Sequence, residues 1–322
     1  MSPKQTRGRI LLAFAAVYLV WGSTYLAIRY AVETIPPYVL GGVRFLIAGA
    51  MLYAFAAWRG APRPTRAELK IATITGILML ALGNGAVNFA ETSVPSGIVA
   101  LIVSTVPLWM VLVDWLRPNG RRPHRLVFAG LTLGLAGMLV LVGPGVFVGG
   151  GHVPASSAIL LLIGSLSWAV GSIITRHGAR PSSPIMATAL QMLTGGVAFL
   201  IVAASLGEFS GFSIAAVSTR SALGALYLAL IGSLIGFTAY IYLLGAVSAA
   251  KAGTYAYVNP VIAVFLGWLI ANEPIGPRTV LAAVIILAGV AIITATQTKT
   301  SHTTDEHPLP FPTGSERTRT AA

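Results

Sequence analysis

The sequence predicts an all-α membrane protein with ten transmembrane helices, arranged as two inverted five-helix repeats. Three observations predict this fold class: the chain is very apolar, its apolar segments have the length of membrane spans, and its two halves resemble each other. Of its 322 residues, 56% are hydrophobic and only 9% are charged, whereas soluble domains average roughly 25% charged residues. So few charges could not cover a water-facing surface, and the chain is therefore predicted to lie in a lipid bilayer.

Ten segments are long enough to cross the bilayer, for which a helix needs about 20 apolar residues. Clusters of turn-forming residues separate them, such as "RPNGRRPH" and "GPGVFVGGGHVP". The first segment follows a basic N-terminus but is too long for the apolar region of a signal peptide, so a retained span is expected. The predicted spans are residues 10–32, 38–58, 70–90, 96–116, 126–143, 156–176, 185–206, 220–244, 251–271 and 279–297.

The positive charges predict the orientation of these spans. The net charge is +12, and most lysines and arginines precede the first span or follow an even-numbered span. On the other side lie Arg220 and Arg278. Lysine and arginine are retained on the cytoplasmic side of a membrane, so both termini are expected in the cytoplasm. This orientation explains the net positive charge, so no nucleic-acid partner is expected.

The two halves of the chain align in order with little drift in their offset, which predicts an internal duplication. Each half holds five spans, an odd number, so the second half must cross the membrane in the opposite sense. Inverted repeats of this kind place a substrate site near the midplane, at the repeat interface. The matches at an offset of 147 are Trp21 with Trp168, Arg29 with Arg176, Pro37 with Pro184 and Gly60 with Gly207; those at 153 are Gly83 with Gly236, Pro107 with Pro260 and Trp115 with Trp268.

This division predicts five regions. A cytoplasmic N-terminus is expected over residues 1–9 and an extracytoplasmic linker over 144–155. The repeats are expected over 10–143 and 156–297. The polar, proline-bearing tail, residues 298–322, is expected to be a disordered cytoplasmic segment.

The stretch "YAYVNP" at 255–260 places polar groups and a helix breaker inside the ninth span. A proline inside a helix leaves the carbonyl one turn earlier unpaired, here Ala256 for Pro260 and Val103 for Pro107. In lipid such a carbonyl must be satisfied by protein or line a wet cavity. We therefore expect a kinked helix that lines a substrate cavity; an interfacial tyrosine belt with a structural kink is the alternative.

Other polar and aromatic residues within the spans extend this candidate cavity. An ionisable group at the depth of Arg44 marks function by default, although helix packing is an equal alternative. Asn84 and Asn88 share a helix face with Glu91 nearby, and Glu91 could also be a solvated loop acid or a proton relay. The predicted cavity residues are Trp21, Tyr25, Arg44, Asn84, Asn88, Glu91, Pro107, Trp168, Tyr255, Tyr257, Asn259 and Pro260.

Two smaller sequence features predict packing. The segments "GLTLG" at 130–134 and "GSLIG" at 232–236 fit the Gly-x-x-x-Gly pattern of closely packed membrane helices. Asp114 lies near the cytoplasmic end of its span and is expected to pair with Arg117 or Arg121.

The sequence contains no motif typical of an enzyme active site, a metal site or a cofactor-binding site. It has no cysteine and five histidines, none of them in a His-Glu-x-x-His pair and none deep in a span. The Gly-x-Ser-x-Gly signature of serine hydrolases and the Walker loop of ATPases are also absent. We therefore expect no enzyme activity, no cofactor, no metal site and no direct use of ATP.

These features together resemble the drug/metabolite transporter superfamily, specifically its ten-helix EamA-type members. The resemblance covers roughly residues 10–297 and rests on "WGSTYLAIR" with a following "RFLIAG", on "VPSGIVALIVSTVPLW", on "TYAYVNPVIAVFLGWLIANEP" and on the "LAG" of spans five and ten. It implies a bundle of ten helices around a central cavity built largely from helices one, three, four, six, eight and nine. It also implies secondary transport in a bacterial inner membrane, commonly export. Members carry an acidic residue after the ninth helix, a position that Glu273 fits.

The expected function is therefore that of a secondary transporter that moves a small metabolite or drug-like solute outward across the cytoplasmic membrane by alternating access. A lipid-headgroup flippase or a passive channel of the same fold is the alternative. The expected partners are a small-molecule substrate and the lipid bilayer, and coupling to protons or to a counter-substrate stays open. The aromatic and amide side chains favour neutral, zwitterionic or amphipathic cargo, while Arg44 and Glu91 leave charged cargo open.

Overall fold

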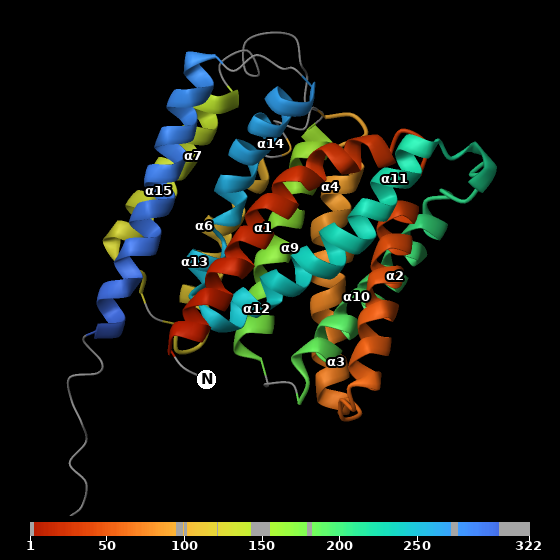
Figure 1. Cartoon of the computed structure of the whole chain (residues 1–322), viewed down its shortest axis with the longest axis horizontal. Helices are drawn as coiled ribbons and strands as arrows, with labels where there is room; N and C mark the ends of the chain where they lie inside the picture. Colours follow the sequence, from red (N-terminus) through yellow and green to blue (C-terminus); the bar gives the residue numbers. More distant parts are fainter. Residues whose placement is uncertain are drawn as a thin grey trace, which may run out of the picture.

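The computed structural model is a bundle of helices (Figure 1), and it describes residues 3–94, 99, 102–120, 122–142, 155–178, 182–271 and 276–302. All regular structure in these ranges is helical, as predicted. The α-helices are α1 (Pro3–Ala31), α2 (Pro37–Trp58), α3 (Arg66–Gly76), α4 (Gly85–Ala90), α6 (Val106–Leu116), α7 (Arg125–Val142), α9 (Ala155–His177), α10 (Pro184–Ser205), α11 (Thr219–Tyr227), α12 (Thr238–Ala246), α13 (Ala249–Ala252), α14 (Tyr255–Ala271) and α15 (Pro277–His302).

Two π-helical segments join shorter helices into continuous rods, and a 3-10 turn, η2 (Ile214–Ala216), precedes α11. The segment η1 (Ile77–Asn84) links α3 to α4, and η3 (Leu228–Phe237) links α11 to α12. Six of the rods are long and apolar enough to cross a membrane: Arg7–Ala31, Pro37–Trp58, Arg66–Ala90, Ser156–His177, Pro184–Ser205 and Thr219–Ala246. Helices α6, α7, α14 and α15 lie in the other predicted spans, with the shorter apolar stretches Val106–Leu116, Arg125–Gly137 and Val280–Ile293.

Three features of the helices add detail to the sequence-based division of the chain. The first helix begins at Pro3, inside the segment expected as a cytoplasmic N-terminus. Helix α15 reaches His302, so the chain is still helical where the disordered tail was expected to begin; residues 303–322 lie outside the described ranges. Pro107 does not kink a continuous helix, because the backbone turns at 104–105 and α6 begins at Val106. Proline is favoured in a first turn, where its missing N–H has no intrahelical partner to lose.

Helices α2 and α10, which correspond to each other in the two repeats, end in the same way. Gly60 after α2 and Gly207 after α10 have positive φ angles of 75° and 72°, a conformation that favours glycine. Beyond each glycine the next N–H bonds back to a carbonyl five residues earlier, at 3.0 Å for Ala61 and 2.9 Å for Glu208. These are Schellman-type ends, and the repeat therefore extends to backbone conformation.

The helix contacts also come in matched pairs. Helix α2 packs on α10 and α7 packs on α15, so the corresponding helices of the two halves touch. Helix α1 packs on the rod that contains η3, and α9 packs on the rod that contains η1. Figure 1 shows α1 and α9 crossing the bundle in opposite directions. This arrangement is the one that an inverted repeat requires.

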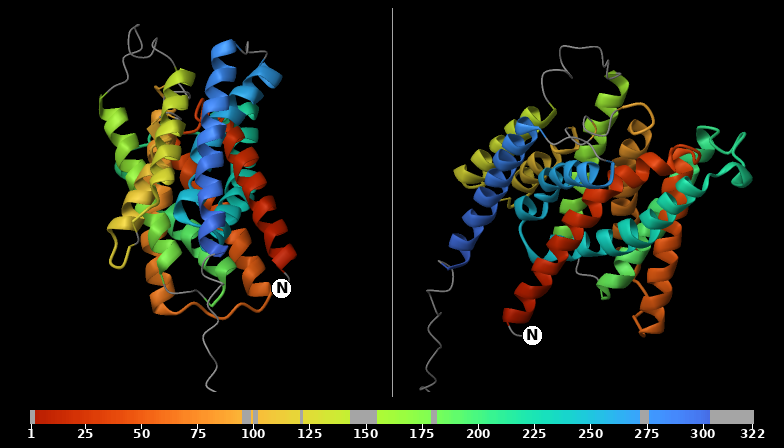
Figure 2. Two further views of the ribbon diagram at one scale, coloured as in Figure 1. Left: turned by 90° about the vertical axis from the view of Figure 1, so that its left-hand side faces the viewer. Right: turned by 45° about the horizontal axis from the view of Figure 1, so that its top comes forward.

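The two ends of the described chain lie at the same end of the bundle. Figures 1 and 2 show the start of α1 and the end of α15 on one side, and the start of α9 on the other. The shared position agrees with an even number of crossings. We call this side of the bundle the termini end; that it faces the cytoplasm stays a prediction from the positive charges.

Glycines bring α7 and α15 into close contact, as the Gly-x-x-x-Gly pattern at 130–134 predicted. A methyl group built on Gly289 would lie 2.8 Å from the Gly130 carbonyl oxygen, and one built on Gly130 would lie 2.9 Å from the Gly289 carbonyl oxygen. No side chain fits between the two backbones unless the helices move apart.

We expect Gly289→Leu to lower stability by about 1–3 kcal/mol, the usual cost of overpacking. Thermal unfolding of the detergent-purified protein measures the effect. Gly245→Leu is the matched control, because a methyl group at Gly245 meets nothing within 4 Å. Equal melting temperatures for the two variants would contradict this account of the α7–α15 contact.

Candidate functional site

A cavity of about 80 Å³ lies where the two repeats meet. Side chains from both halves line it, so neither repeat could form it alone. All six spans that the family resemblance implied contribute, and the second span contributes as well. The lining residues are Trp21, Thr24, Tyr25, Ile28, Arg44, Phe45, Gly83, Asn84, Val87, Val103, Val106, Leu161, Gly164, Ser165, Trp168, Gly232, Phe237, Tyr255 and Asn259.

One wall of the cavity is polar. Arg44, on α2, is 5% exposed, and its Nη2 donates a hydrogen bond of 2.6 Å to the Asn84 side-chain oxygen. The guanidinium carbon lies 4.4 Å from the centre of the neighbouring Phe45 ring. Asn84 is the last residue of the π-helical segment η1. A cation and a π-helical segment therefore meet at the cavity.

Four aromatic side chains, those of Trp21, Trp168, Tyr240 and Tyr255, pack together beside the cavity and form an aromatic layer. The Trp21 ring centre lies 4.9 Å from that of Tyr255, 5.1 Å from that of Tyr240 and 5.6 Å from that of Trp168. The Trp21 contacts with Tyr255 and Trp168 are edge-to-face, a favoured geometry for aromatic pairs. Trp21 and Trp168 are repeat mates, so the pseudo-two-fold axis passes close to this layer.

Hydrogen bonds close the bundle between this layer and the termini end. The Tyr18 hydroxyl bonds to Thr254 Oγ1 at 2.6 Å. The Tyr240 hydroxyl bonds to Ser172 Oγ at 2.8 Å and accepts from Trp168 Nε1 at 3.2 Å. Tyr240 and Ser172 are both fully buried. We call Tyr18, Ser172, Tyr240 and Thr254 the closed layer.

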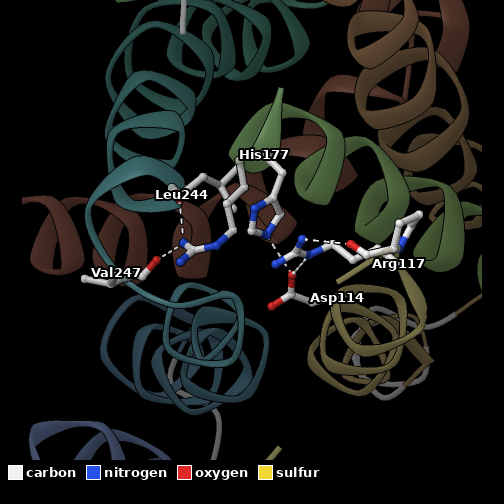
Figure 3. A network of polar contacts seen from close by, with 7 residues as sticks. Asp114, Arg117, His177, Leu244 and Val247 are labelled. Carbon is white, nitrogen blue, oxygen red and sulfur yellow. Dashed lines mark hydrogen bonds and ion pairs between the residues drawn. The ribbon is translucent and has the colours of Figure 1, made fainter. Parts of the chain in front are cut away.

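A second polar network reinforces the termini end (Figure 3). Asp114, at the end of α6, pairs with Arg117 at 2.8 Å, one of the two predicted partners, and with His177 Nε2 at 2.7 Å. Arg176 donates to the carbonyl oxygens of Leu244 and Val247, at the end of α12. A cation near the C-terminus of a helix satisfies carbonyls that have no intrahelical partner. The ends of three helices are therefore tied together.

The π-helical segments occupy matched positions in spans three and eight. π-helices are rare and often mark functional sites. Each makes a hydrogen bond to the first helix of the other repeat: Trp21 Nε1 donates to the Gly232 carbonyl at 3.1 Å, and Ser167 Oγ donates to the Leu78 carbonyl at 2.8 Å. In a bilayer such carbonyls need protein partners. Both segments therefore depend on contacts between the repeats.

Comparison with known proteins identifies the family. The sequence profile of the EamA-like transporter family matches residues 8–143 and again residues 155–295. The chain belongs to this family. Its two matches coincide closely with the two repeats, and the family relationship makes the chain a multi-pass membrane transporter.

Individual relatives agree with this membership. The chain is 42% identical over 285 residues to the "Uncharacterized inner membrane transporter YedA" of Escherichia coli (strain K12), covering 88% of this chain and 89% of the relative. It is 26% identical to the "Probable amino-acid metabolite efflux pump" of the same strain, covering 86% and 91%. A crystal structure with 21% identity superposes with a TM-score of 0.72, over 90% of this chain and 98% of the other; this shows the fold alone.

Seven of the twelve predicted cavity residues lie together in the lining of this EamA-family chain, and their role in transport stays a prediction. They come from α1, α2, η1, α9 and α14, so residues far apart in the sequence converge on one space. These residues are Trp21, Tyr25, Arg44, Asn84, Trp168, Tyr255 and Asn259.

The other five predicted residues lie outside the lining. Asn88 is fully buried and donates a hydrogen bond of 3.2 Å to the Pro37 carbonyl, at the start of α2. Tyr257 is also fully buried, and its hydroxyl donates to the Leu131 carbonyl at 3.3 Å, next to α15. Glu91 is 7% exposed. Pro107 and Pro260 are buried, the latter inside α14 as predicted.

The structure adds lining residues that the sequence analysis did not select. Gly83 faces Trp168, and its repeat mate Gly236 faces Trp21 beside the lining. The alignment of the two glycines was the available signal for this contact. Ser165 lies one turn before Trp168 on α9, but a serine in an apolar helix gave no reason to prefer it. The position expected to carry the family's acidic residue, Glu273, lies outside the described ranges.

Proposed function

We propose that this chain is a secondary transporter that moves a small metabolite or drug-like solute outward by alternating access. The observation that carries the proposal is the cavity between the repeats, together with the aromatic layer and the hydrogen-bonded closed layer beside it. The lining is mixed aromatic, amide and cationic, as expected of a site for a small organic solute. The name of the efflux-pump relative supports the outward direction.

The repeat symmetry supports the alternating step. In an inverted repeat, each half can adopt the conformation of the other, and this exchange closes one side while it opens the other. The repeat mate of Tyr18 in the closed layer is Ser165, which lines the cavity; the mate of Ser172 in the closed layer is Tyr25, which also lines the cavity. These two pairs support the proposal that residues of the closed layer line the cavity in the opposite state.

Tyr255 and Tyr257 provide a matched test of the site. Both lie at the start of α14 and are buried, but only Tyr255 lines the cavity. We expect Tyr255→Ala to raise the solute concentration for half-maximal transport by roughly 5- to 10-fold, the equivalent of one lost aromatic contact. Tyr257→Ala lowers stability and leaves transport per folded molecule unchanged.

The measurement is uptake into proteoliposomes, normalised to folded protein and screened over amino acids, nucleosides and toxic metabolites under solute and pH gradients. Equal effects of the two substitutions on transport would exclude this site. Conductance faster than a carrier can cycle would point to a channel, and movement of lipid headgroups instead of the solutes would point to a flippase. No accelerated movement of any solute would count against transport itself.

A further inference from the structure

The cavity contains a buried positive charge that no carboxylate among the described residues neutralises. Arg44 is the one formally charged residue in the lining that the described part of the chain provides. It is 5% exposed, so water does little to solvate it. It also lies well inside the second span, seven residues after the helix begins at Pro37.

The protein satisfies this guanidinium only in part. Its polar contact is the 2.6 Å hydrogen bond from Nη2 to the Asn84 oxygen, a neutral acceptor. Its Nε has no hydrogen-bond partner within the described ranges. The ion pairs of Asp114 and of Glu33 do not reach Arg44. The Phe45 ring adds a cation–π contact at 4.4 Å.

A buried cation without a counter-ion is costly, and proteins usually pair such a group or leave it for a ligand. The guanidinium has five N–H donors in a planar fork that matches the two oxygens of a carboxylate. Asn84 uses one of these donors. The remaining donors and the uncompensated charge make this wall of the cavity a place for an anion.

The other walls favour an apolar body attached to that anion. Trp21, Trp168 and Tyr255 present aromatic rings from α1, α9 and α14, and valine, leucine and isoleucine side chains fill much of the remaining lining. A dianion would carry a second charge that the lining does not neutralise.

We propose that the transported solute is a small organic monoanion, whose carboxylate pairs with Arg44 and whose aromatic or apolar body packs against Trp21, Trp168 and Tyr255. This inference rests on the proposed transport function and specifies the chemical class of its cargo. Asn84 holds the guanidinium in place until the carboxylate arrives.

The test compares carboxylates with their uncharged amides, because the two share shape and differ in charge. The probes are benzoate, phenylacetate and indole-3-acetate, each paired with its primary amide, and calorimetric binding to the purified protein in nanodiscs is the readout. At least one carboxylate is expected to bind more tightly than its amide. Arg44→Gln is expected to weaken that binding roughly 10- to 100-fold, the equivalent of losing a charge-assisted hydrogen bond, and to weaken amide binding much less, so that the carboxylate preference is lost.

Asn84→Asp is the second variant, and it keeps the arginine. It replaces the amide that accepts a hydrogen bond from Arg44 with a carboxylate, so an internal anion competes with the solute and carboxylate binding falls more than amide binding. Arg29→Gln is the matched control, because Arg29 is exposed and lies outside the lining. Melting curves of all four proteins show that each variant is folded.

The outcomes separate this inference from the proposed function. Two results would each overturn the anion site. In the first, no carboxylate binds more tightly than its own amide. In the second, the carboxylate preference survives Arg44→Gln. In both cases gradient-driven uptake of uncharged solutes would leave the transport function standing. Absence of uptake for every solute, charged or uncharged, would instead contradict the function.

Discussion

Joining positions 18 and 254 with a short crosslink is expected to abolish transport almost completely. The Tyr18 hydroxyl and Thr254 Oγ1 lie 2.6 Å apart in the closed layer, and alternating access requires this layer to separate once in every cycle. A covalent link holds the layer shut and leaves the cavity available from the other side. Solute binding should therefore persist while transport is lost.

The chain suits this experiment because it contains no native cysteine. Tyr18→Cys and Thr254→Cys are combined and treated with a short thiol-specific bifunctional reagent, because the tyrosine ring leaves a gap too wide for a direct disulfide. Each single variant with the same reagent is the control, and reductive cleavage of a disulfide-containing linker should restore transport. Full transport by the crosslinked double variant would show that the closed layer does not open.

The second large effect is expected at the two glycine–tryptophan contacts. A methyl group built on Gly236 would lie 2.5 Å from Trp21 Nε1, and one built on Gly83 would lie 3.1 Å from the Trp168 Cβ. Leucine at either position has to displace a tryptophan of the aromatic layer, and overpacking of this kind costs about 1–3 kcal/mol. Because the displaced ring fills the cavity or blocks the approach of the helices, transport is expected to be lost in both variants.

The paired positions sharpen this prediction. Gly83→Leu and Gly236→Leu are repeat mates, so they should impair transport to a similar degree despite lying 153 residues apart. Gly245→Leu is the control, on the same rod as Gly236 but in open space. Transport rates in proteoliposomes, compared at equal amounts of folded protein, give the result. Normal transport by Gly83→Leu would mean that transport does not depend on the position of Trp168. Normal transport by Gly236→Leu would mean the same for Trp21.

Much of the fold could be predicted from the sequence, because lipid imposes simple requirements on it. Span length, turn residues and the distribution of arginine and lysine follow from the thickness and polarity of the bilayer. The repeat was visible because residues with special backbone or packing roles, such as Gly60 and Gly207, recur at corresponding positions.

The parts that were missed depend on contacts between distant segments. Tyr255 and Tyr257 look alike in the sequence, and only the direction of α14 in the bundle turns one toward the cavity and the other toward Leu131. The sequence also did not show that the backbone turns at 104–105, so that Pro107 lies in the first turn of α6 and not inside a longer helix. The π-helical segments have no local sequence signal, since their extra width is stabilised by side chains such as Trp21 from the other repeat.

The central claim is that the two repeats exchange conformations around a shared cavity. Ser165 and Ser172 test it on a single helix: they lie two turns apart on α9, and both can be replaced by cysteine conservatively. Ser165 lines the cavity, whereas Ser172 is fully buried in the closed layer. In the exchanged state, each serine takes the position that its repeat mate has now. Ser172 then lines the cavity, as Tyr25 does here, and Ser165 joins a closed layer, as Tyr18 does here.

The measurement is the rate at which a membrane-impermeant thiol reagent labels Ser165→Cys and Ser172→Cys, applied from each side of the membrane with and without a transported solute. The account predicts that Ser165→Cys is labelled from the side opposite the chain termini and Ser172→Cys from the termini side. It also predicts that the solute shifts the two rates in opposite directions. Labelling of both cysteines from the same side, or parallel shifts in the two rates, would contradict the exchange of conformations.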